Sequence, residues 1–551
     1  MTLNWSDDPI AGTSEDSFER SEFAKAAAGR IIDTHSWNTS TVFALTGPWG
    51  TGKSSVITMV LEHLHDREPD WRAVMFSPWA SADSEALVAE FYTALASALP
   101  ASGSTEARRA LERCLTVASP GLKAIPLFGA AAAGYADLAR DRLKNPKPWH
   151  QAFKEASATL EDVGVPILIV IDDLDRLQRD ELMALLRVVR LLGRFPGVQF
   201  LLAYDEQTLA ATLSGGLRPS PDSHQDARRF IEKIVQYPLS VPPLSDTQVL
   251  ERLNDGLNEI VHLTARDPAP LTAHRFVSIM RTAVRGGLRT PRAIDRYLAQ
   301  VGHAFSMIGP DEIDDADLAM LTFLKVHLPG LYETLPLWKS QLCRAGRRTR
   351  FMSPQTGMVS DEPVDYGPLF ESVPQGHLLE QARLVMSKLF PVITQTTEGT
   401  VSRHERSIAR SDYFDRYFTL SVSRHDVRDA AVREALYAAA HPVADDGGAL
   451  HGLLQNSPDS SASRLALVLD KARTATDNDA TGSLVTPSLI SSVAGALNQI
   501  DDTQPALLSN RESAVRWLAT MIRDRAEDWD AEVLVDALSG GPALLRVLDA
   551  L

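Results

Sequence analysis

The sequence predicts an α/β fold: a doubly wound parallel sheet with a helical insertion, followed by mainly α-helical C-terminal domains. Three observations predict this fold class. Short apolar runs rich in β-formers alternate with helical patterns over residues 30–245. A glycine-rich loop joins the first of these runs to its helix. Beyond residue 245, strand-like runs become rare, and apolar residues recur three or four positions apart.

The first predicted strand is the run TVFAL at residues 41–45. It leads through the glycine-rich turn into the helical pattern SSVITMVLEHL. A second strand is expected over 72–77, and its helix over 84–99. These elements follow one another in the order of a βαβα unit.

The next stretch, residues 104–162, has helical patterns and one loop, and we expect it to be an insertion in the sheet domain. The run PILIVI at 166–171 is continuous and apolar, which is typical of a central parallel strand buried on both faces. VQFLLA at 198–203 predicts another buried strand. Helices are expected at 180–192 and 225–235, so strands and helices continue to alternate.

Helical periodicity dominates after the prolines of residues 239–244. Helices are expected at 249–263, 273–285, 292–307, 316–324 and 513–522. Residues 457–463 and 472–483 are poor in large apolar residues and are predicted to be loops or linkers. The domain organisation predicted from these patterns is an N-terminal arm (1–29), a sheet domain (30–245), a helical domain (246–345) and a helical C-terminal partner-binding region (346–551).

The composition is that of an ordinary globular protein, with 44% hydrophobic and 23% charged residues. At 551 residues the chain is too long for one compact core. Its formal net charge of -16 disfavours a role in coating nucleic acid. The two cysteines, Cys114 and Cys343, provide neither a disulfide framework nor a cysteine-based zinc site, which fits a reducing compartment.

The sequence predicts neither a targeting peptide nor a membrane span. The N-terminus lacks a basic region followed by an apolar run, and its acidic residues within 7–16 are expected to form a solvated arm. Residues 120–138 are the one stretch that could be compared with a membrane span, but they contain Lys123, two prolines and three glycines. We expect this stretch to be a buried or partner-facing helical segment, and the protein to be cytoplasmic.

The segment GPWGTGKS, from Gly47 to Ser54, matches the phosphate-binding pattern G-x-x-x-x-G-K-[ST] between a strand and a helix. Its glycines let backbone N–H groups converge on a polyphosphate, and the helix N-terminus adds partial positive charge. Lys53 is expected to reach the β and γ phosphates, and the Ser54 hydroxyl to bind Mg²⁺. The alternative is a chance glycine-rich turn. The predicted nucleotide contacts are Gly47, Pro48, Trp49, Gly50, Thr51, Gly52, Lys53, Ser54 and Ser55.

A second motif, ILIVIDDLDRL at 167–177, ends a buried strand in adjacent carboxylates. Ligands of open parallel sheets bind at this edge. Asp172 is predicted to hold Mg²⁺ through water, and Asp173 to orient or deprotonate the attacking water. Capping of the next helix by Asp172 or Asp175 is the alternative, with Arg176 as an ion-pair partner of Asp175.

Polar residues that follow later elements are further candidates. Tyr204 and Asp205 end the next strand, where they could sense the γ-phosphate or fix the attacking water; Asp205 could instead cap the following helix. Arg289, Arg292 and Arg296 lie around the start of a later helix, and we select Arg292 as the arginine that folds back onto the phosphates. A plain surface arginine is the alternative.

Two other groups of arginines have open interpretations. Arg228 and Arg229 could act in trans as an arginine finger across a subunit interface. The basic run CRAGRRTR at 343–350 could form a local patch that binds phosphates, and a solvated basic loop is the alternative.

Taken together, these motifs resemble the KAP family of P-loop NTPases, which is related to the signal-transducing STAND ATPases. The resemblance rests on GPWGTGKS, VMFSPWA with Trp79, IDDLDRL, LLAYD, RRFIEKIVQYPLSVPP and TPRAIDRYL, in family order over 30–301 and more weakly to 429. Many members carry transmembrane helices between the two nucleotide motifs. Residues 120–138 depart from that pattern, which favours a soluble bacterial member similar to the NTPase subunit of Qat-type anti-phage systems.

The motifs and the resemblance together imply ATP and Mg²⁺ as cofactors, and three functions are weighed as alternatives. The first is a Mg-dependent ATPase that switches how the helical C-terminal region meets protein partners of a multi-component complex, with homo-oligomerisation as one route. The second is an ATP-binding scaffold with little turnover. The third is a nucleic-acid sensor or motor, which the acidic balance disfavours. ATP is preferred over GTP because of the family and because no N-K-x-D element is evident.

Overall fold

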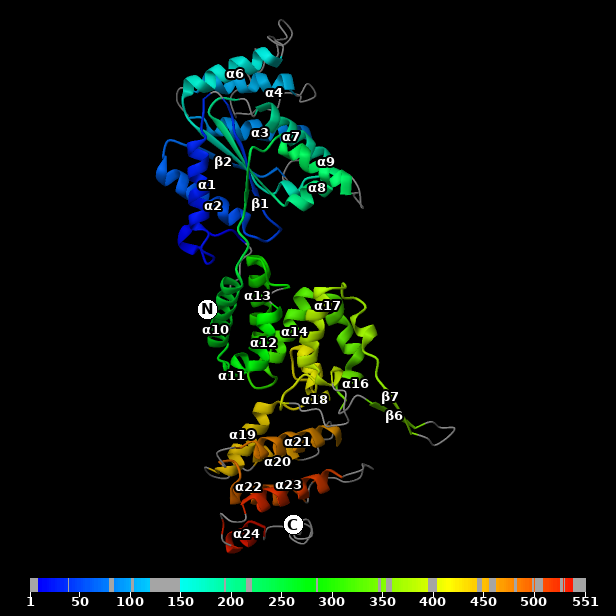
Figure 1. Ribbon diagram of the computed structural model, residues 1–551. Coiled ribbons are helices and arrows are strands. Elements are labelled where there is room, and N and C mark those ends of the chain that lie inside the picture. The colour runs from blue at the N-terminus through cyan, green and yellow to red at the C-terminus, as the bar shows by residue number, and fades with distance from the viewer. Residues whose placement is uncertain are drawn as a thin grey trace. The chain divides into compact units, whose positions relative to one another are not determined.

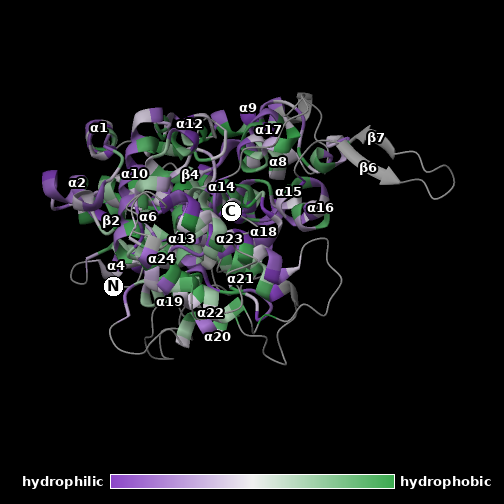
Figure 2. Cartoon of the chain, turned by 90° about the horizontal axis from the view of Figure 1, so that it is seen from below, coloured by the Kyte–Doolittle hydropathy of each residue, from purple (hydrophilic) through white to green (hydrophobic). Residues whose placement is uncertain are grey.

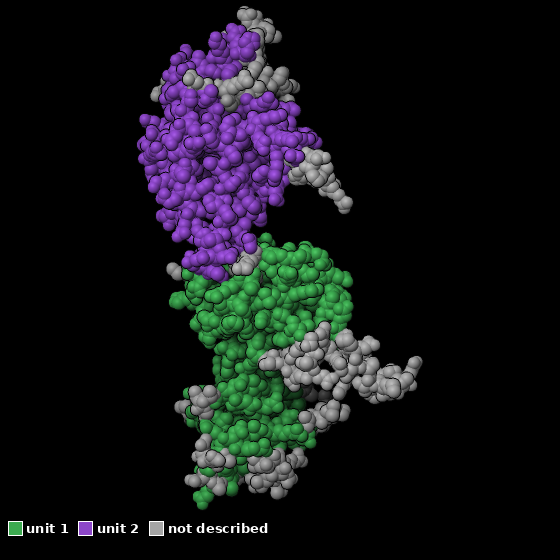
Figure 3. Space-filling view, in the orientation of Figure 1, with its two compact units in different colours: residues 1–5, 253–287, 296–551 green, residues 6–252, 288–295 purple. Residues whose placement is uncertain are grey.

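A computed structural model of the chain contains two compact units (Figure 3). We call the first the sheet unit; it is built from the described residues of 6–252 and 288–295. The second, the helical unit, is built from those of 253–287 and 296–551. The structure describes residues 8–37, 39–78, 84–100, 104–118, 149–192, 195–214, 221–283, 286–344, 348–352, 359–394, 404–442, 448–454, 462–479, 483–497, 500, 509–525, 529 and 531–538.

The sheet unit contains five parallel strands in the order β2-β3-β4-β1-β5. Figure 1 labels β1 and β2 of this sheet. Within this sheet β1 has a neighbour on each side, so that Phe43 pairs with Leu201 of β4 and with Tyr237 of β5. The predicted doubly wound α/β fold is therefore confirmed. The strands are β1 (Val42–Thr46), β2 (Arg72–Phe76), β3 (Ile167–Ile171), β4 (Val198–Tyr204) and β5 (Tyr237–Ser240).

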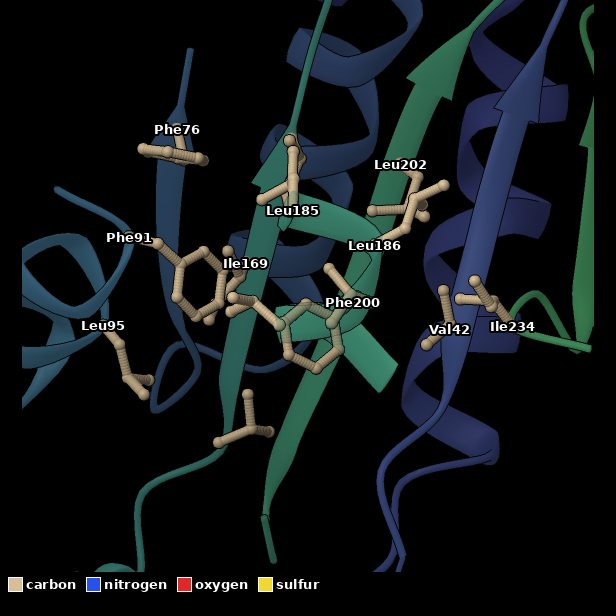
Figure 4. Close-up of a cluster of buried hydrophobic side chains, with 14 of the residues drawn as sticks. Val42, Phe76, Phe91, Leu95, Ile169, Leu185, Leu186, Phe200, Leu202 and Ile234 are labelled. Atoms are coloured by element: carbon tan, nitrogen blue, oxygen red, sulfur yellow. The ribbon is translucent and has the colours of Figure 1, made fainter. Parts of the chain in front are cut away.

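Helices cover both faces of this sheet, because alternate residues of each strand point to opposite faces. On one face, Val42, Ile169 and Phe200 pack with side chains of α3 and α7 (Figure 4). On the other face, Phe43 and Leu201 pack against α1 and α2. The covering helices are α1 (Ser21–Asp33), α2 (Lys53–Arg67), α3 (Ser84–Ala98) and α7 (Arg179–Leu192).

The predicted helical insertion at 104–162 is helical at both ends. Its described helices, α4 (Thr105–Ala118) and α6 (Trp149–Val163), pack against each other. Residues 119–148, which include the stretch 120–138, lie outside the described part. Among the described helices, none has the length and apolarity needed to cross a bilayer. Two further helices of this unit, α8 (Glu206–Ser214) and α9 (Pro221–Glu232), follow β4.

The edge strand β5 was not predicted, because its residues were interpreted as part of a proline-rich boundary. Among the described strands, Tyr237–Ser240 pairs only with β1. An edge strand tolerates proline, since half of its backbone groups have no partner strand to bond. Pro238 can therefore lie opposite Ala44 within the ladder.

The first described residues pack against α2 and are not a free arm, although Asp8 and Glu15 are exposed as expected. The Thr13 N–H donates to the Glu62 carboxylate of α2 (2.6 Å). Asp16 accepts a hydrogen bond from the Ser21 N–H (2.8 Å) where α1 begins. Backbone N–H groups of this segment thus find carboxylate partners, and α1 buries Ala24 and Ile31 in the core.

The helical unit is made almost entirely of helices, and several of them carry both hydrophobic and hydrophilic residues along their length (Figure 2). Two helices, α10 and α13, have residues in both units. The helices after the sheet domain are α10 (Asp246–Leu263), α11 (Ala269–Thr272), α12 (His274–Ala283), α13 (Pro291–Met307), α14 (Asp315–His327), α15 (Pro329–Thr334), α16 (Lys339–Leu342), α17 (His377–Leu389), α18 (Ser411–Thr419), α19 (Asp429–Ala440), α20 (Gly448–Leu454), α21 (Ala462–Asp477), α22 (Pro487–Ala496), α23 (Asn510–Arg525) and α24 (Ala531–Leu538).

Two sequence expectations for this unit are wrong. The linker predicted at 472–483 is helical through Asp477, because its small residues fit a close contact between α21 and α23. There the Trp517 indole donates to the buried Thr476 hydroxyl (2.9 Å). The basic run at 343–350 does not end as a loop, since β6 (Arg348–Met352) pairs antiparallel with β7 (Val359–Pro363).

Candidate nucleotide-binding site

The glycine-rich loop connects the end of β1 to the start of α2. Gly50 (φ +81°) and Gly52 (φ +84°) adopt left-handed backbone conformations that favour glycine. A Cβ at Gly47 would lie 2.8 Å from the Thr51 hydroxyl oxygen. That hydroxyl donates a hydrogen bond to the Pro48 carbonyl (2.7 Å). Gly47, Pro48 and Thr51 therefore stabilise the loop by contacts with one another.

The two sequence motifs meet at the beginning of α2. The Ser54 hydroxyl donates to the Asp172 carboxylate (2.6 Å), although the two residues are 118 positions apart. Lys53 is buried, and its ammonium group donates to the Gly47 carbonyl (3.0 Å). The loop, a cation, a hydroxyl and a carboxylate are therefore gathered at the carboxyl end of the parallel strands.

The two adjacent aspartates have different surroundings. Asp172 is only 7% exposed and also accepts a hydrogen bond from the Asp173 N–H (2.8 Å). Asp173 has φ +58°, an uncommon value for a residue with a side chain, and its carboxylate lies 3.2 Å from the Arg176 guanidinium. Burial raises the pKa of Asp173, and the neighbouring Asp172 charge raises this pKa further.

The expected ion pair of Asp175 with Arg176 is not found, because Arg176 pairs with Asp173 instead. Asp175 accepts a hydrogen bond from the Asp205 N–H (3.1 Å) and so ties the end of β3 to the end of β4. Helix α7 begins beyond it, where the Gln178 N–H donates to Glu181 (2.9 Å). Capping of that helix by Asp175 is therefore also wrong.

A cavity of about 570 Å³ opens beside the loop. This volume lies in the range of small-molecule sites. Gly47, Pro48 and Thr51 are not among its lining residues. Other predicted contacts line it: Trp49, Gly50, Gly52, Lys53, Ser54, Ser55, Asp172, Asp173 and Arg292.

Arg292 lies at the start of α13, and its guanidinium is 4.4 Å from the centre of the Trp49 ring. Its backbone N–H donates to the Gly50 carbonyl (3.4 Å). Of the other two candidate arginines, Arg289 is not among the cavity-lining residues, and Arg296 belongs to the helical unit. The structure thus brings one of the three to the loop.

Tyr204 and Asp205 do not line the cavity. Tyr204 is buried in the hydrophobic core between the sheet and its helices. The Asp205 carboxylate accepts a hydrogen bond from the Gln207 N–H (2.9 Å), which is the capping alternative. The two arginines proposed as a finger have partners within the unit: Arg228 pairs with Glu206 (3.1 Å) and Arg229 with Asp226 (3.6 Å).

Sequence reasoning missed the contribution of residues 8–20 to this cavity. Ile10, Asp16, Phe18 and Arg20 all line it. An available signal was Asp16 shortly before the helical pattern that starts at Ser21, since aspartate favours helix starts.

The cavity edge offers oxygen donors that suit a hard cation. The Ser54 hydroxyl and the Asp172 carboxylate are the ligand types that Mg²⁺ prefers. Both line the cavity beside Lys53, whose charge suits phosphate. The residues therefore fit a nucleotide bound with Mg²⁺.

Comparison with known families supports this assignment of the fold and loop. The sequence profile of the KAP family P-loop domain matches residues 20–308, more than half of the chain. The chain belongs to the KAP family. The match includes both nucleotide motifs and the start of α13. Trp79, one of the residues that carried the resemblance, lies outside the described part.

Among curated proteins, this KAP protein is similar to the phage T7 exclusion protein of Escherichia coli (strain K12). The two are 23% identical over 329 residues, which cover 55% of this chain and 44% of the relative. The chain therefore matches less than half of the length of that protein.

Two solved structures show distant likeness to the KAP protein. The ORC1 protein of Aeropyrum pernix in complex with DNA aligns with a TM-score of 0.29 and 12% identity, over 68% of this chain and 84% of that one. Cdc6p from Pyrobaculum aerophilum aligns with a TM-score of 0.33 and 14% identity, over 76% and 96%. The fold is defined by the strand order itself.

Proposed function

We propose that this KAP protein binds ATP with Mg²⁺ and hydrolyses the bond between the β and γ phosphates. The observation that carries the proposal is the contact of Ser54 with Asp172 (2.6 Å) beside the buried Lys53. Two motifs far apart in the sequence thus supply a phosphate cradle and a pair of oxygen ligands to one cavity.

Each residue has a separate task in the proposed reaction. Backbone N–H groups of the loop and the Lys53 ammonium group bind the β and γ phosphates. Ser54 and Asp172 would hold Mg²⁺, which neutralises negative charge on the phosphate oxygens when bound. Asp173 orients the attacking water or accepts its proton, and a carboxylate of raised pKa suits proton acceptance.

We further propose that the nucleotide state switches how the helical unit meets protein partners in a cytoplasmic anti-phage complex. The name of the similar phage T7 exclusion protein supports a role in defence. A large, mainly helical unit supports a role in protein contacts. Homo-oligomerisation and contact of Arg292 with the phosphates belong to the same proposal.

The alternative of an ATP-binding scaffold makes a different prediction about turnover. A scaffold retains ATP tightly and releases little phosphate, whereas a switch hydrolyses ATP. A nucleic-acid sensor or motor is disfavoured by the net charge of -16. Salt-dependent DNA binding that weakens when the arginines of the run at 343–350 are neutralised would favour it.

Steady-state phosphate release by purified protein tests the proposal. We expect ATP turnover that requires Mg²⁺, and we expect Asp173→Asn to lower kcat by about 100-fold or more while ATP still binds. Lys53→Ala should lower ATP affinity itself. Full nucleotide affinity in Lys53→Ala would refute the phosphate site, and tight ATP retention without turnover in the wild type would favour the scaffold.

A further inference from the structure

A buried arginine outside both sequence motifs donates a hydrogen bond to the glycine-rich loop. Arg20, the residue before α1, is only 6% exposed and lines the cavity. Its Nη1 donates to the Thr51 carbonyl within the loop. Its Nη2 donates to the Pro242 carbonyl (2.9 Å), beyond β5. One guanidinium therefore ties the loop to the chain that follows the edge strand.

Gly52 of the loop leaves room for the Arg20 guanidinium. A Cβ at Gly52 would lie 3.1 Å from Arg20 Nη1, closer than most real Cβ contacts. Gly52 also has φ +84°, which favours glycine. Position 52 therefore requires glycine for two reasons: its left-handed backbone conformation and its close contact with Arg20.

The hydrogen bond from Arg20 to the Thr51 carbonyl also fixes the direction of the next backbone N–H group. The Thr51 carbonyl and the Gly52 N–H belong to one planar trans peptide, in which they point in opposite directions. Gly52 lines the cavity, whereas Thr51 does not. Because the guanidinium fixes the direction of the Thr51 carbonyl, it also fixes the direction of the Gly52 N–H, and loop N–H groups of this kind bind phosphate.

The charge of Arg20 is not matched by a close carboxylate. Among the described residues, no carboxylate lies within ion-pair distance of its guanidinium, and its hydrogen bonds go to neutral carbonyl oxygens. Asp16 is close enough to influence it, but the Asp16 carboxylate accepts hydrogen bonds from the Ser21 and Phe18 N–H groups. A buried cation of this kind is stabilised by an anion bound nearby.

We propose that Arg20 is a positioning residue of the triphosphate site, which turns the Gly52 N–H toward the phosphates and adds a buried positive charge beside them. This inference rests on the proposed ATP binding. It assigns a role in phosphate recognition to the segment before α1.

Calorimetric binding of Mg-ATP, Mg-ADP and inorganic tripolyphosphate to Arg20 variants tests the inference. We expect Arg20→Met to lower the affinity for ATP and for tripolyphosphate by about tenfold or more, the loss typical of a hydrogen bond from a charged group. Arg20→Lys should recover part of this affinity, because lysine restores the charge but cannot span two carbonyls. Lys25→Met, on the exposed face of α1, which Arg20 precedes, is the matched control and should bind as the wild type does.

The outcomes separate this inference from the proposed function. If the wild type binds neither ATP nor tripolyphosphate, the proposed function itself fails. If the wild type binds both and Arg20→Met binds them equally well, or loses only thermal stability, the inference fails. Should Arg20→Met not fold, Arg20→Lys decides alone: intermediate affinity supports the positioning role, and wild-type affinity overturns it.

Discussion

At the scale of single residues, one backbone torsion separates the roles of two neighbouring aspartates. Asp172 directly follows β3, and its carboxylate accepts a hydrogen bond from Ser54 at the start of α2. The left-handed conformation of Asp173 (φ +58°) turns its carboxylate to Arg176. Strained residues of this kind gather at functional sites, where the surrounding structure holds them. The strain therefore supports separate tasks for the two carboxylates.

A single histidine in the helical unit makes stability depend on pH. Burial and, to a smaller extent, the charge of Arg296 together lower the pKa of His327 to about 4. Its Nε2 has no hydrogen-bond partner among the described residues. Because the pKa is lower in the folded chain, the unfolded chain takes up the proton first as the pH falls below about 6.5, and the folded state loses stability from there toward pH 4.

The measurement compares wild type with His327→Gln, which cannot titrate. We expect the wild type to lose up to about 2 kcal/mol more unfolding free energy than the variant between about pH 7.5 and about pH 5. Chemical denaturation at several pH values measures this difference. Parallel pH profiles for the two proteins would show that His327 is protonated alike in the folded and unfolded chains.

At the scale of elements, a buried ion cluster joins three helices and the segment before α14. Arg416 of α18 is 2% exposed and donates to Asp426 (2.6 Å), to Glu312 (3.0 Å) and to Asp429 (3.2 Å). Lys471 of α21 pairs with Asp426 (2.9 Å) and Asp429 (2.8 Å). The cluster thus connects the approach to α14 with α18, α19 and α21.

Replacing Arg416 should leave the carboxylates of Glu312, Asp426 and Asp429 with fewer cationic partners. We expect Arg416→Met to lower the unfolding free energy of the helical unit by about 3–5 kcal/mol. The protection of this unit from hydrogen exchange should fall by a corresponding amount. Arg433→Ala is the matched control, because this more exposed α19 arginine also pairs with an aspartate, Asp311 (3.1 Å). The control should cost about 1 kcal/mol or less. Equal losses in the two variants would contradict the importance of burial.

The elements also show how far sequence patterns could predict the fold and the site. The continuous apolar run of β3 and the glycine-rich loop were recognisable because burial on both faces and backbone approach to phosphate demand those residues. The edge strand β5 was missed because its signal is short and contains Pro238. The role of Arg20 was missed because its partners are backbone carbonyls, which no sequence pattern records.

Side-chain pairing was the least predictable part of the site. Asp175 and Arg176 are adjacent and opposite in charge, yet each has a different partner. Their partners depend on the turn at Asp173 and on the position of β4, which are tertiary features. The meeting of Ser54 with Asp172, by contrast, was predicted because both motifs end at the same edge of the sheet.

At the scale of the whole molecule, α13 provides a covalent route from the nucleotide cavity to the helical unit. Its first residues, Pro291 to Asp295, belong to the sheet unit, and the rest belongs to the helical unit. Arg292 in its first turn contacts Trp49 of the loop (4.4 Å), and Trp49 is 61% exposed. A rearrangement of the loop around a γ-phosphate would therefore act on a helix that continues into the other unit.

This arrangement predicts that hydrogen exchange in the helical unit differs between ATP and ADP. We expect the difference in protection at residues 296–307 to correspond to about 1 kcal/mol or more, which is typical of coupled sites. Arg292→Ala should reduce that difference even at saturating nucleotide, because it removes the side-chain contact of α13 with Trp49. Arg289→Ala, three residues earlier and not lining the cavity, is the control and should keep it. If Arg292→Ala retains the full ATP-dependent difference, the nucleotide signal reaches the helical unit by another route. The contact between Trp49 and Arg292 would then only line the cavity.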